Sequence, residues 1–441
     1  MASLLKEFDR DDLENAGYEL HRFAAELYPI CRSISGDGLR RTLALLETKI
    51  PLNTFEIPSG TPVFDWIVPK EWNIRDAYVT GPGGERILDF RRCNLHVVNY
   101  SAPIHASMPL SELKTHLHSL PDHPDWIPYR TSYYDETWGF CLSHNQMLAL
   151  ADGRYEVHID STLADGTLTY SECYLPGGST DEVLISCHAC HPSLANDNLS
   201  GLAIAAHLAH FLKGRDLRLS YRFLFIPGTI GAITWLMRNR ETTRRIRHGL
   251  VLTCLGDAGA FHYKASRRGN AEIDRAAAHV LRHYSKSAEF LDFSPYGYDE
   301  RQYCSPGFDL PVGCLMRSVW GTFPEYHTSA DNLEFIQAVK LGESLRMCVA
   351  IMDVLENNGR YYNLNPFCEP QLGRRKLYRS MLDESDRVEM MARLWVLNLS
   401  DGEHSLLDIA DRSGLCFQTV SDAADLLRDN GLLRAAQENV S

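Results

Sequence analysis

The stretch VLISCHACHPSLANDNLSG, from Val183 to Gly201, decides how the chain is interpreted. An apolar run ends on His188, His191 follows it, and Asp197 stands at the start of a predicted helix. Histidine and aspartate at these spacings are typical of a metal site. A polar loop after a strand is the alternative, because aspartate is favoured at helix N-termini. The rest of the chain has to decide between the two.

Bulk properties exclude several classes of protein. A length of 441 residues favours two or three domains over a single core. The formal net charge of -13 at pH 7 argues against broad binding to nucleic acid or to anionic membranes. No apolar run reaches the ~18 residues of a membrane helix, and the N-terminal segment lacks the apolar centre of a signal peptide. We therefore expect a cytoplasmic protein without nucleic-acid or membrane partners.

The twelve cysteines are scattered along the chain, which favours free thiols in a reducing compartment over disulfides. The one Cys-x-x-Cys pair, Cys187 and Cys190, is interleaved with histidines. A structural zinc knuckle needs a second ligand pair at similar spacing, and the sequence offers none.

The pattern of predicted helices and strands changes three times along the sequence. After residue 180, apolar strands alternate with helices, which predicts an α/β sheet covered on both faces. Short strand-like pieces between proline and glycine turns predict a small β-rich module at 58–165, inserted into an α/β domain of 1–57 and 166–370. The aromatic segment WIPYRTSYYDETWGFCLS is expected in the core and interface of this module. A helix–turn–helix pattern with a wing predicts a winged-helix domain at 371–441.

The predicted winged helix is poorly suited to DNA. Acidic residues outnumber basic ones from Asp401 onward, and the helix that would enter a groove carries Asp422 and Asp425 before its first arginine, Arg428. Contacts to phosphates supply most non-specific affinity for DNA. We therefore expect this domain to pack or to contact protein.

Two histidines and two aspartates fall near strand ends of the predicted sheet: His188, Asp197, Asp257 and His327. Ligands gather at the carboxyl ends of strands in such sheets. Each residue alone is more often a cap or a loop residue, but their coincidence favours a metal site. Mixed imidazole and carboxylate donors suit zinc or a similar divalent ion.

The order of these four residues resembles that of the co-catalytic zinc aminopeptidases, the clan that includes glutamate carboxypeptidase and glutaminyl cyclase. SCHAC, ANDNLSGLA, CLGD and EYHTSADN each resemble a metal-ligand motif of this clan. DWIVPKEWNIRDAY and the domain order resemble an aminopeptidase-like group that is often encoded in biosynthetic gene clusters for polysaccharides or natural products. The resemblance covers nearly the whole chain. It implies a zinc-aminopeptidase-like mixed sheet flanked by helices, with an inserted β module and a C-terminal winged helix.

The resemblance also implies a ligand set. One zinc would be held by His188, Asp197 and Asp257, and Asp197 would bridge to a second metal beside His327. In the clan an aspartate two residues after the first histidine orients its ring, and here that position is Cys190, a poor acceptor. His191 is then either a ligand or an orienting group for His188, or a plain loop histidine.

The clan carries two adjacent glutamates, a general base and a metal ligand, where this chain has Gly228 and Thr229. We therefore expect one well-occupied zinc, with a second site that is weak or absent. Loss of a positioned base lowers the rate by roughly 10²- to 10⁴-fold. Asp299, Glu300 or Glu325 is a candidate replacement, and a substrate that brings its own base is the alternative.

Candidate substrate-binding residues are Arg301, Tyr326 and Arg267. The segment YDERQYCSPGFDLPV, which contains Arg301, resembles the clan's substrate pocket, although an ion pair between Glu300 and Arg301 is an equal alternative. Arg267 and its neighbour Arg268 suit a clamp on a carboxylate or phosphate, or else form a solvated turn.

The sequence favours a metal-dependent hydrolase that cleaves an amide bond of a small peptide or aminoacylated metabolite, with a metal-bound water as nucleophile. A catalytically impaired relative that serves as a metal-containing binding or assembly protein is the main alternative. A winged-helix regulator is disfavoured by the acidic recognition region. Homo-oligomerisation stays open.

Overall fold

The computed structural model describes residues 3–8, 10–378 and 383–436. The chain divides into two compact units. The larger unit comprises Arg10–Ala271 and Glu289–Arg346, and the smaller comprises Met1–Asp9, Glu272–Ala288 and Met347–Ser441.

The larger unit is built on an eight-stranded sheet with the strand order β1-β10-β12-β11-β13-β16-β14-β15. Its four inner strands run parallel, whereas strands towards both edges pair antiparallel. Every residue of β11 and β12 is buried, as expected for strands with both faces covered. The predicted α/β mixed sheet is therefore confirmed. The strands are β1 (Asn53–Pro58), β10 (Thr167–Leu175), β11 (Glu182–His188), β12 (Ser220–Ile226), β13 (Ile246–Leu252), β14 (Phe261–Lys264), β15 (Ala288–Leu291) and β16 (Val312–Met316).

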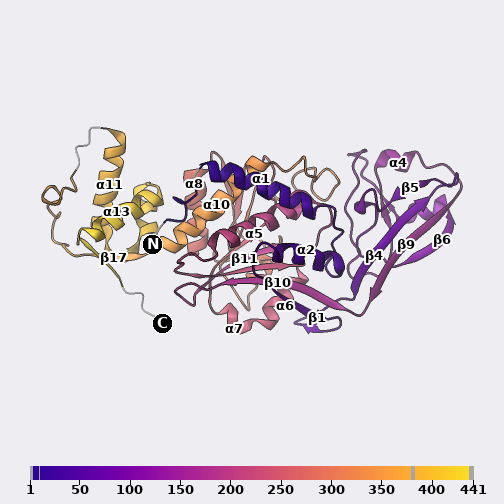
Figure 1. The fold of residues 1–441 in the computed structure, drawn as a ribbon, viewed down its shortest axis with the longest axis horizontal. Coiled ribbons are helices and arrows are strands. Elements are labelled where there is room, and N and C mark those ends of the chain that lie inside the picture. The colour runs from indigo at the N-terminus through magenta and orange to yellow at the C-terminus, as the bar shows by residue number, and fades with distance from the viewer. Residues whose placement is uncertain (1–2, 9, 379–382, 437–441) are drawn as a thin grey trace. The chain divides into compact units, whose positions relative to one another are not determined.

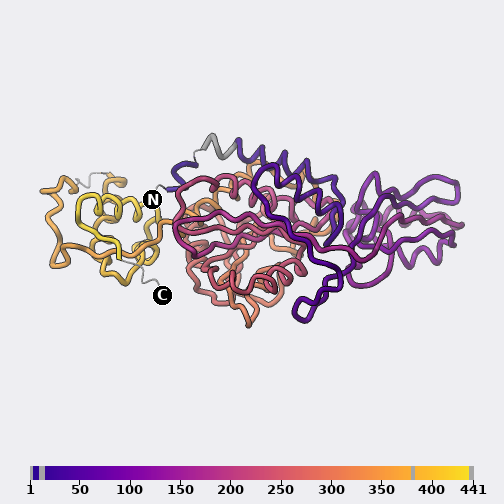
Figure 2. Tube along the Cα trace, turned by 60° about the horizontal axis from the view of Figure 1, so that its bottom comes forward, coloured from indigo at the N-terminus to yellow at the C-terminus, as the bar shows by residue number. Residues whose placement is uncertain are grey.

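Helices cover both faces of this sheet (Figure 1). α1, α2 and α5 lie over one face, and α6 and α7 lie over the other, as the turned view also shows (Figure 2). α5 is apolar around most of its circumference because it is enclosed by α1 and the sheet. On the opposite face, α6 buries Trp235 in the main core. The helices are α1 (Arg10–Leu27), α2 (Asp37–Glu47), α5 (Gly201–Leu212), α6 (Ile230–Arg238), α7 (Arg240–Thr243), α9 (Glu300–Tyr303) and α10 (Ala338–Asn357).

The strand register brings three loops to one edge of the sheet. His188, the last residue of β11, pairs with Ile226 at the end of β12, and Ser186 pairs with Val251 near the end of β13. The chain that follows β11 forms a short π-helix, η3 (Ala195–Ser200), before it enters α5. The candidate metal ligands therefore start from neighbouring carboxyl ends, as ligands do in other sheets of this kind.

A β-rich module is inserted between two neighbouring strands of this sheet. Pro58 at the end of β1 pairs with Thr167 at the start of β10, so residues 59–166 occupy the place of a hairpin turn. The module has its own antiparallel sheet, β5-β4-β9-β6, and its own apolar core. Its elements are β2 (Pro62–Val63), β3 (Trp66–Ile67), β4 (Glu71–Thr80), β5 (Arg86–Asp89), η1 (Asn94–His96), β6 (Ile104–Pro109), α3 (Leu110–Leu113), η2 (Lys114–His116), β7 (Leu117–His118), β8 (Phe140–Cys141), α4 (His144–Leu148) and β9 (Arg154–Ala164).

The smaller unit contains the predicted winged helix. α12 and α13 form the helix–turn–helix, with Gly414 in the left-handed region at the end of α12, and both helices contact α11. The three-stranded sheet β18-β17-β19 includes β17, which begins at residue 360, before the predicted domain start at residue 371. The elements are α8 (Glu272–Tyr284), β17 (Arg360–Asn363), η4 (Gly373–Arg375), α11 (Glu384–Leu399), β18 (Asp401–Ser405), α12 (Leu406–Ser413), α13 (Phe417–Asp429) and β19 (Leu433–Ala435).

None of the twelve cysteines, all of which lie in the described ranges, forms a disulfide, and most of them are buried. None of the helices in the described ranges is both long and apolar enough to cross a membrane.

Candidate metal centre

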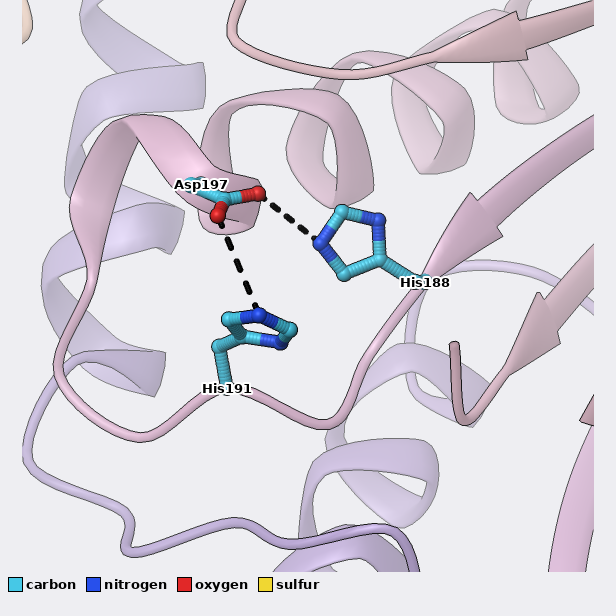
Figure 3. Close-up of side chains that lie close together, drawn as sticks. All are labelled: His188, His191 and Asp197. Atoms are coloured by element: carbon cyan, nitrogen blue, oxygen red, sulfur yellow. Dashed lines mark hydrogen bonds and ion pairs between the residues drawn. The ribbon is translucent and has the colours of Figure 1, made fainter. Parts of the chain in front are cut away.

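Three imidazoles surround the carboxylate of Asp197. His188 Nε2 lies 2.9 Å from Asp197 Oδ1, and His327 Nε2 lies 3.0 Å from Asp197 Oδ2. His191 Nε2 lies 3.8 Å from the same Oδ2. Figure 3 shows His188 at the end of a strand, His191 on the loop that follows, and Asp197 at the next helical turn. The ligand atoms of His188, His191 and Asp197 lie within 4.8 Å of one another, so this group can hold a metal ion.

The protonation states in this cluster suit a cation. Burial acts to raise the pKa of Asp197, but the adjacent imidazoles of His191 and His188 outweigh it and hold the pKa well below its usual range. Burial lowers the pKa of His191 well below its ordinary value, and the neighbouring histidines lower it further. At neutral pH Asp197 is therefore a carboxylate and His191 a neutral imidazole, which are the forms that bind metals. His191 thus lies among the candidate ligands.

A second buried aspartate positions the first. Asp331 accepts hydrogen bonds from the backbone N–H groups of Asn196, at 2.5 Å, and Asp197, at 3.0 Å. Burial raises the pKa of Asp331 to about 8. Asp331 was not among the predicted site residues, although it lies four residues after His327 in EYHTSADN. Its position in the same motif as His327 was the one feature of the sequence that could have indicated it.

Two tyrosines lie against the cluster. The Tyr298 hydroxyl donates to Asp197 Oδ1 at 2.7 Å, and its ring stacks on the His188 ring with centroids 4.7 Å apart. Tyr326 stacks on the His327 ring at 4.0 Å, and the two tyrosine hydroxyls lie 3.3 Å apart. The predicted substrate residue Tyr326 is therefore beside the candidate centre. Tyr298 was missed, although it directly precedes the predicted Asp299.

Asp257 lies outside the group of close ligand atoms. Its Oδ1 accepts hydrogen bonds from Gly259 N and Ser318 Oγ, at 2.6 and 2.7 Å. Its Oδ2 accepts from the side-chain amide of Asn196 at 2.7 Å. In this arrangement Asp257 orients the residue that precedes Asp197. Its role as a metal ligand stays a prediction.

Gly228 leaves room beside the cluster. A Cβ atom at Gly228 would lie 3.6 Å from the Cβ of His188 and 3.5 Å from the sulfur of Cys190, which are ordinary van der Waals distances. The Cys190 sulfur accepts a hydrogen bond from Gly228 N and lies 3.2 Å from His191 Nδ1. Thr229, at a φ of 62°, begins the turn into α6. The position where the clan carries a base therefore faces His188 and has no side chain.

Two of the three candidate base carboxylates, Asp299 and Glu300, have different surroundings. Asp299 Oδ1 accepts a hydrogen bond from Thr229 N at 2.7 Å, and burial raises its pKa to about 6. Glu300 is fully buried and accepts from Lys264 Nζ at 2.8 Å. Arg301 donates to Thr229 Oγ1 at 3.3 Å. The ion pair with Glu300 that was one alternative for Arg301 is therefore not the one formed: Glu300 pairs with Lys264.

Arg267 lies on a turn. Its guanidinium forms a part-exposed ion pair with Asp309 at 2.8 Å, and Arg268 also contacts Asp309. These contacts agree with the solvated-turn interpretation, and binding of substrate by Arg267 stays a prediction.

The inserted module contacts the loop that carries His327. Tyr129 N donates to His327 O, and Ser329 N donates to Ile127 O, both at 2.8 Å. The Tyr129 ring is 5.1 Å from the rings of both His191 and His327. The aromatic segment of the module was expected in its core and interface, and Tyr129 lies at such an interface. Its contact with the candidate ligands was not predicted.

Two family models together match most of the chain. A model described as "Domain of unknown function (DUF4910)" matches residues 21–358, and a winged helix-turn-helix model matches residues 359–435. A protein of Clostridium acetobutylicum named "Putative polysaccharide biosynthesis protein with aminopeptidase-like domain" is 50% identical over 419 residues, which are 95% of this chain and 96% of that protein.

Solved structures show the same fold. The crystal structure of a "putative peptidase" from Clostridium acetobutylicum has a TM-score of 0.93 at 48% identity, over 98% of this chain and 100% of that one. A zinc aminopeptidase from Bacillus subtilis has a TM-score of 0.57 at 12% identity, over 77% of this chain and 94% of that one, a likeness of fold alone. The chain therefore belongs to the DUF4910 family, with the fold of the zinc aminopeptidases and a C-terminal winged helix-turn-helix domain.

Proposed function

We propose that the chain is a metal-dependent hydrolase that cleaves an amide bond of a small peptide or aminoacylated metabolite. The observation that carries this proposal is the buried Asp197 carboxylate with the Nε2 atoms of three histidines around it. The aminopeptidase-like fold and the peptidase name of the relative from Clostridium acetobutylicum support it.

The donors fit zinc, which takes imidazole nitrogens and carboxylate oxygens in a roughly tetrahedral arrangement. When bound, zinc would acidify a water molecule and polarise a carbonyl group. His188, His191 and Asp197 would form the main site, because their ligand atoms lie together. His327 lies against the same Asp197 Oδ2 atom as His191, so a second metal would have to share these donors with the first. This supports one well-occupied site and a weak or absent second.

Asp299 is the better candidate for the base that Gly228 cannot supply. It accepts a hydrogen bond from Thr229 N, and so lies beside the position where the clan carries its glutamates. With a pKa of about 6, it is largely ionised at neutral pH and can still accept and return a proton. Glu300 is already neutralised by Lys264.

The absent side chain at Gly228 favours a second candidate function. A chain that keeps the metal ligands but lacks a positioned base would bind a substrate-like molecule without turning it over. This is the role of a metal-containing binding or assembly protein. Turnover separates the two functions, whereas metal content does not.

The test combines zinc binding with turnover of aminoacyl amides and dipeptides by the full chain. Asp197→Asn is expected to lower zinc affinity by at least 100-fold and to abolish turnover, since it removes the shared carboxylate. Asp257→Asn is the matched variant: a similar loss of zinc would make Asp257 a ligand, and retained zinc would make it a positioning residue. Zinc binding by wild-type chain without cleavage of any member of the panel would contradict the hydrolase and favour the binding protein.

A further inference from the structure

A cavity of about 480 Å³ opens beside the candidate metal centre. Its walls come from residues between 120 and 131 of the inserted module and from the loop at 324–328 that carries His327. Tyr326 and His327 line it, so a molecule in this cavity would lie next to a candidate ligand. The cavity is therefore the natural place for the part of a substrate that extends beyond the scissile bond.

The module wall of this cavity is held in place from both sides. Pro128 forms a β-bridge with Thr328, and Tyr129 N donates to His327 O. On its other side, Asn99 N donates to Arg130 O at 2.8 Å. The backbone that carries Arg130 is thus fixed between the module and the His327 loop, although the Arg130 side chain itself is exposed.

The charges in the cavity favour an anion. Among the described residues that line it none is an aspartate or glutamate, whereas two of them, Arg130 and His123, are an arginine and a histidine. In the described part of the chain, no carboxylate forms an ion pair with Arg130. A guanidinium without such a partner can give two parallel hydrogen bonds to a carboxylate or a phosphate.

We propose that Arg130 forms a subsite for an anionic group, a carboxylate or a phosphate, on the molecule that binds at the Asp197 centre. The inserted module would then select substrates by charge, and its role would extend beyond stability. This inference rests on the proposed function for the identity of the scissile amide, but the subsite itself is testable by binding alone.

The experiment uses the full zinc-loaded chain and three probes that differ in one group. L-Alanyl-glycine carries a carboxylate, L-alanyl-aminomethylphosphonate carries a phosphonate, and L-alanyl-glycinamide is uncharged at that end. Binding is measured by calorimetry for wild-type chain, Arg130→Ala, Arg130→Lys and the control Arg41→Ala, which removes an exposed arginine from α2. Turnover of the carboxylate and amide probes is measured in parallel.

Wild-type chain is expected to bind one anionic probe at least tenfold more tightly than the amide, and the tighter of the two anions identifies the group. Tenfold corresponds to about 1.4 kcal/mol, close to the lower range for hydrogen bonds to charged groups. Arg130→Ala should reduce this ratio to within about twofold, Arg130→Lys should retain part of it, and Arg41→Ala should leave it unchanged. High salt should weaken the preference, because Arg130 is exposed.

The inference is overturned if wild-type chain shows no preference for either anion or no binding of any probe, or if Arg130→Ala retains the preference. The last result would mean that the anion contacts the metal or another cation. An Arg130-dependent preference without cleavage of any probe would support the subsite and contradict the hydrolase. Cleavage of a probe without the preference would support the hydrolase and contradict the subsite.

Discussion

Introducing a glutamate at Gly228 is the sharpest test of how this centre works. A Cβ atom there would meet the Cβ of His188 and the sulfur of Cys190 at 3.6 and 3.5 Å, so the new side chain starts in ordinary contact beside His188. The backbone of Gly228 also lies outside the left-handed region that favours glycine. Gly228→Glu should therefore fold and bind zinc as the wild-type chain does.

The expected gain follows from the role of the new carboxylate. A positioned general base contributes roughly 10²- to 10⁴-fold to the rate, or about 2.7 to 5.4 kcal/mol of barrier. This full gain is expected if no other group now takes the proton. If Asp299 already does so, Gly228→Glu should gain less than about tenfold, and Asp299→Asn should cost the wild-type chain at least 100-fold.

The assay is steady-state turnover of aminoacyl amides by zinc-loaded wild-type chain, Gly228→Glu and Gly228→Gln. The glutamine variant has nearly the same shape but cannot take a proton, so it separates chemistry from packing. The reasoning would be refuted if Gly228→Glu bound zinc with an unchanged melting temperature, yet was no faster than Gly228→Gln, while wild-type chain was also inactive. Gly228 would then not face the reacting centre.

Three further predictions test the surroundings of the centre. Since the pKa of Asp299 is raised to about 6 and a base acts in its deprotonated form, turnover should rise with pH through about 6 and level off above it, and Asp299→Asn should remove this rise from the pH–rate profile. Tyr129→Ala should lower zinc affinity by about 10- to 100-fold in a chelator competition, because its ring lies against two candidate ligands, whereas Tyr129→Phe should change it little. Asp331→Leu should destabilise the metal-free chain by about 1 to 3 kcal/mol in urea unfolding, because it leaves two buried backbone N–H groups without an acceptor; a loss below about 0.5 kcal/mol would count against its positioning role.

The α/β sheet and the winged helix could be predicted because their signals are local. Apolar runs such as the one that ends on His188 predict buried strands, and the glycine at 414 marks the turn between the two helices of the helix–turn–helix. The ligand candidates followed from the same logic, since strand ends converge at one edge of a sheet. His188 and Asp197 lie where this argument expects them.

The contacts that the sequence did not reveal all depend on long-range packing. The pairing of Glu300 with Lys264 joins segments 36 residues apart, and no local pattern specifies it. The contact of Tyr129 with His327 joins the inserted module to a loop almost two hundred residues later. Asp257 shows that a position at a strand end does not by itself identify a metal ligand. A carboxylate there can be oriented by local hydrogen bonds as readily as by a metal.

The hydrogen bonds that tie the inserted module to the His327 loop have a kinetic consequence. His188, His191 and Asp197 come from one continuous stretch of chain, whereas the carbonyl of His327 is held by Tyr129 of the module. A transient opening of the module would release one donor and leave the other three in place. Exchange of a metal that uses His327 would then be gated by the opening rate of the module. Substitutions that weaken the hydrogen bonds of residues 127–129 should therefore speed this exchange more than they weaken equilibrium affinity.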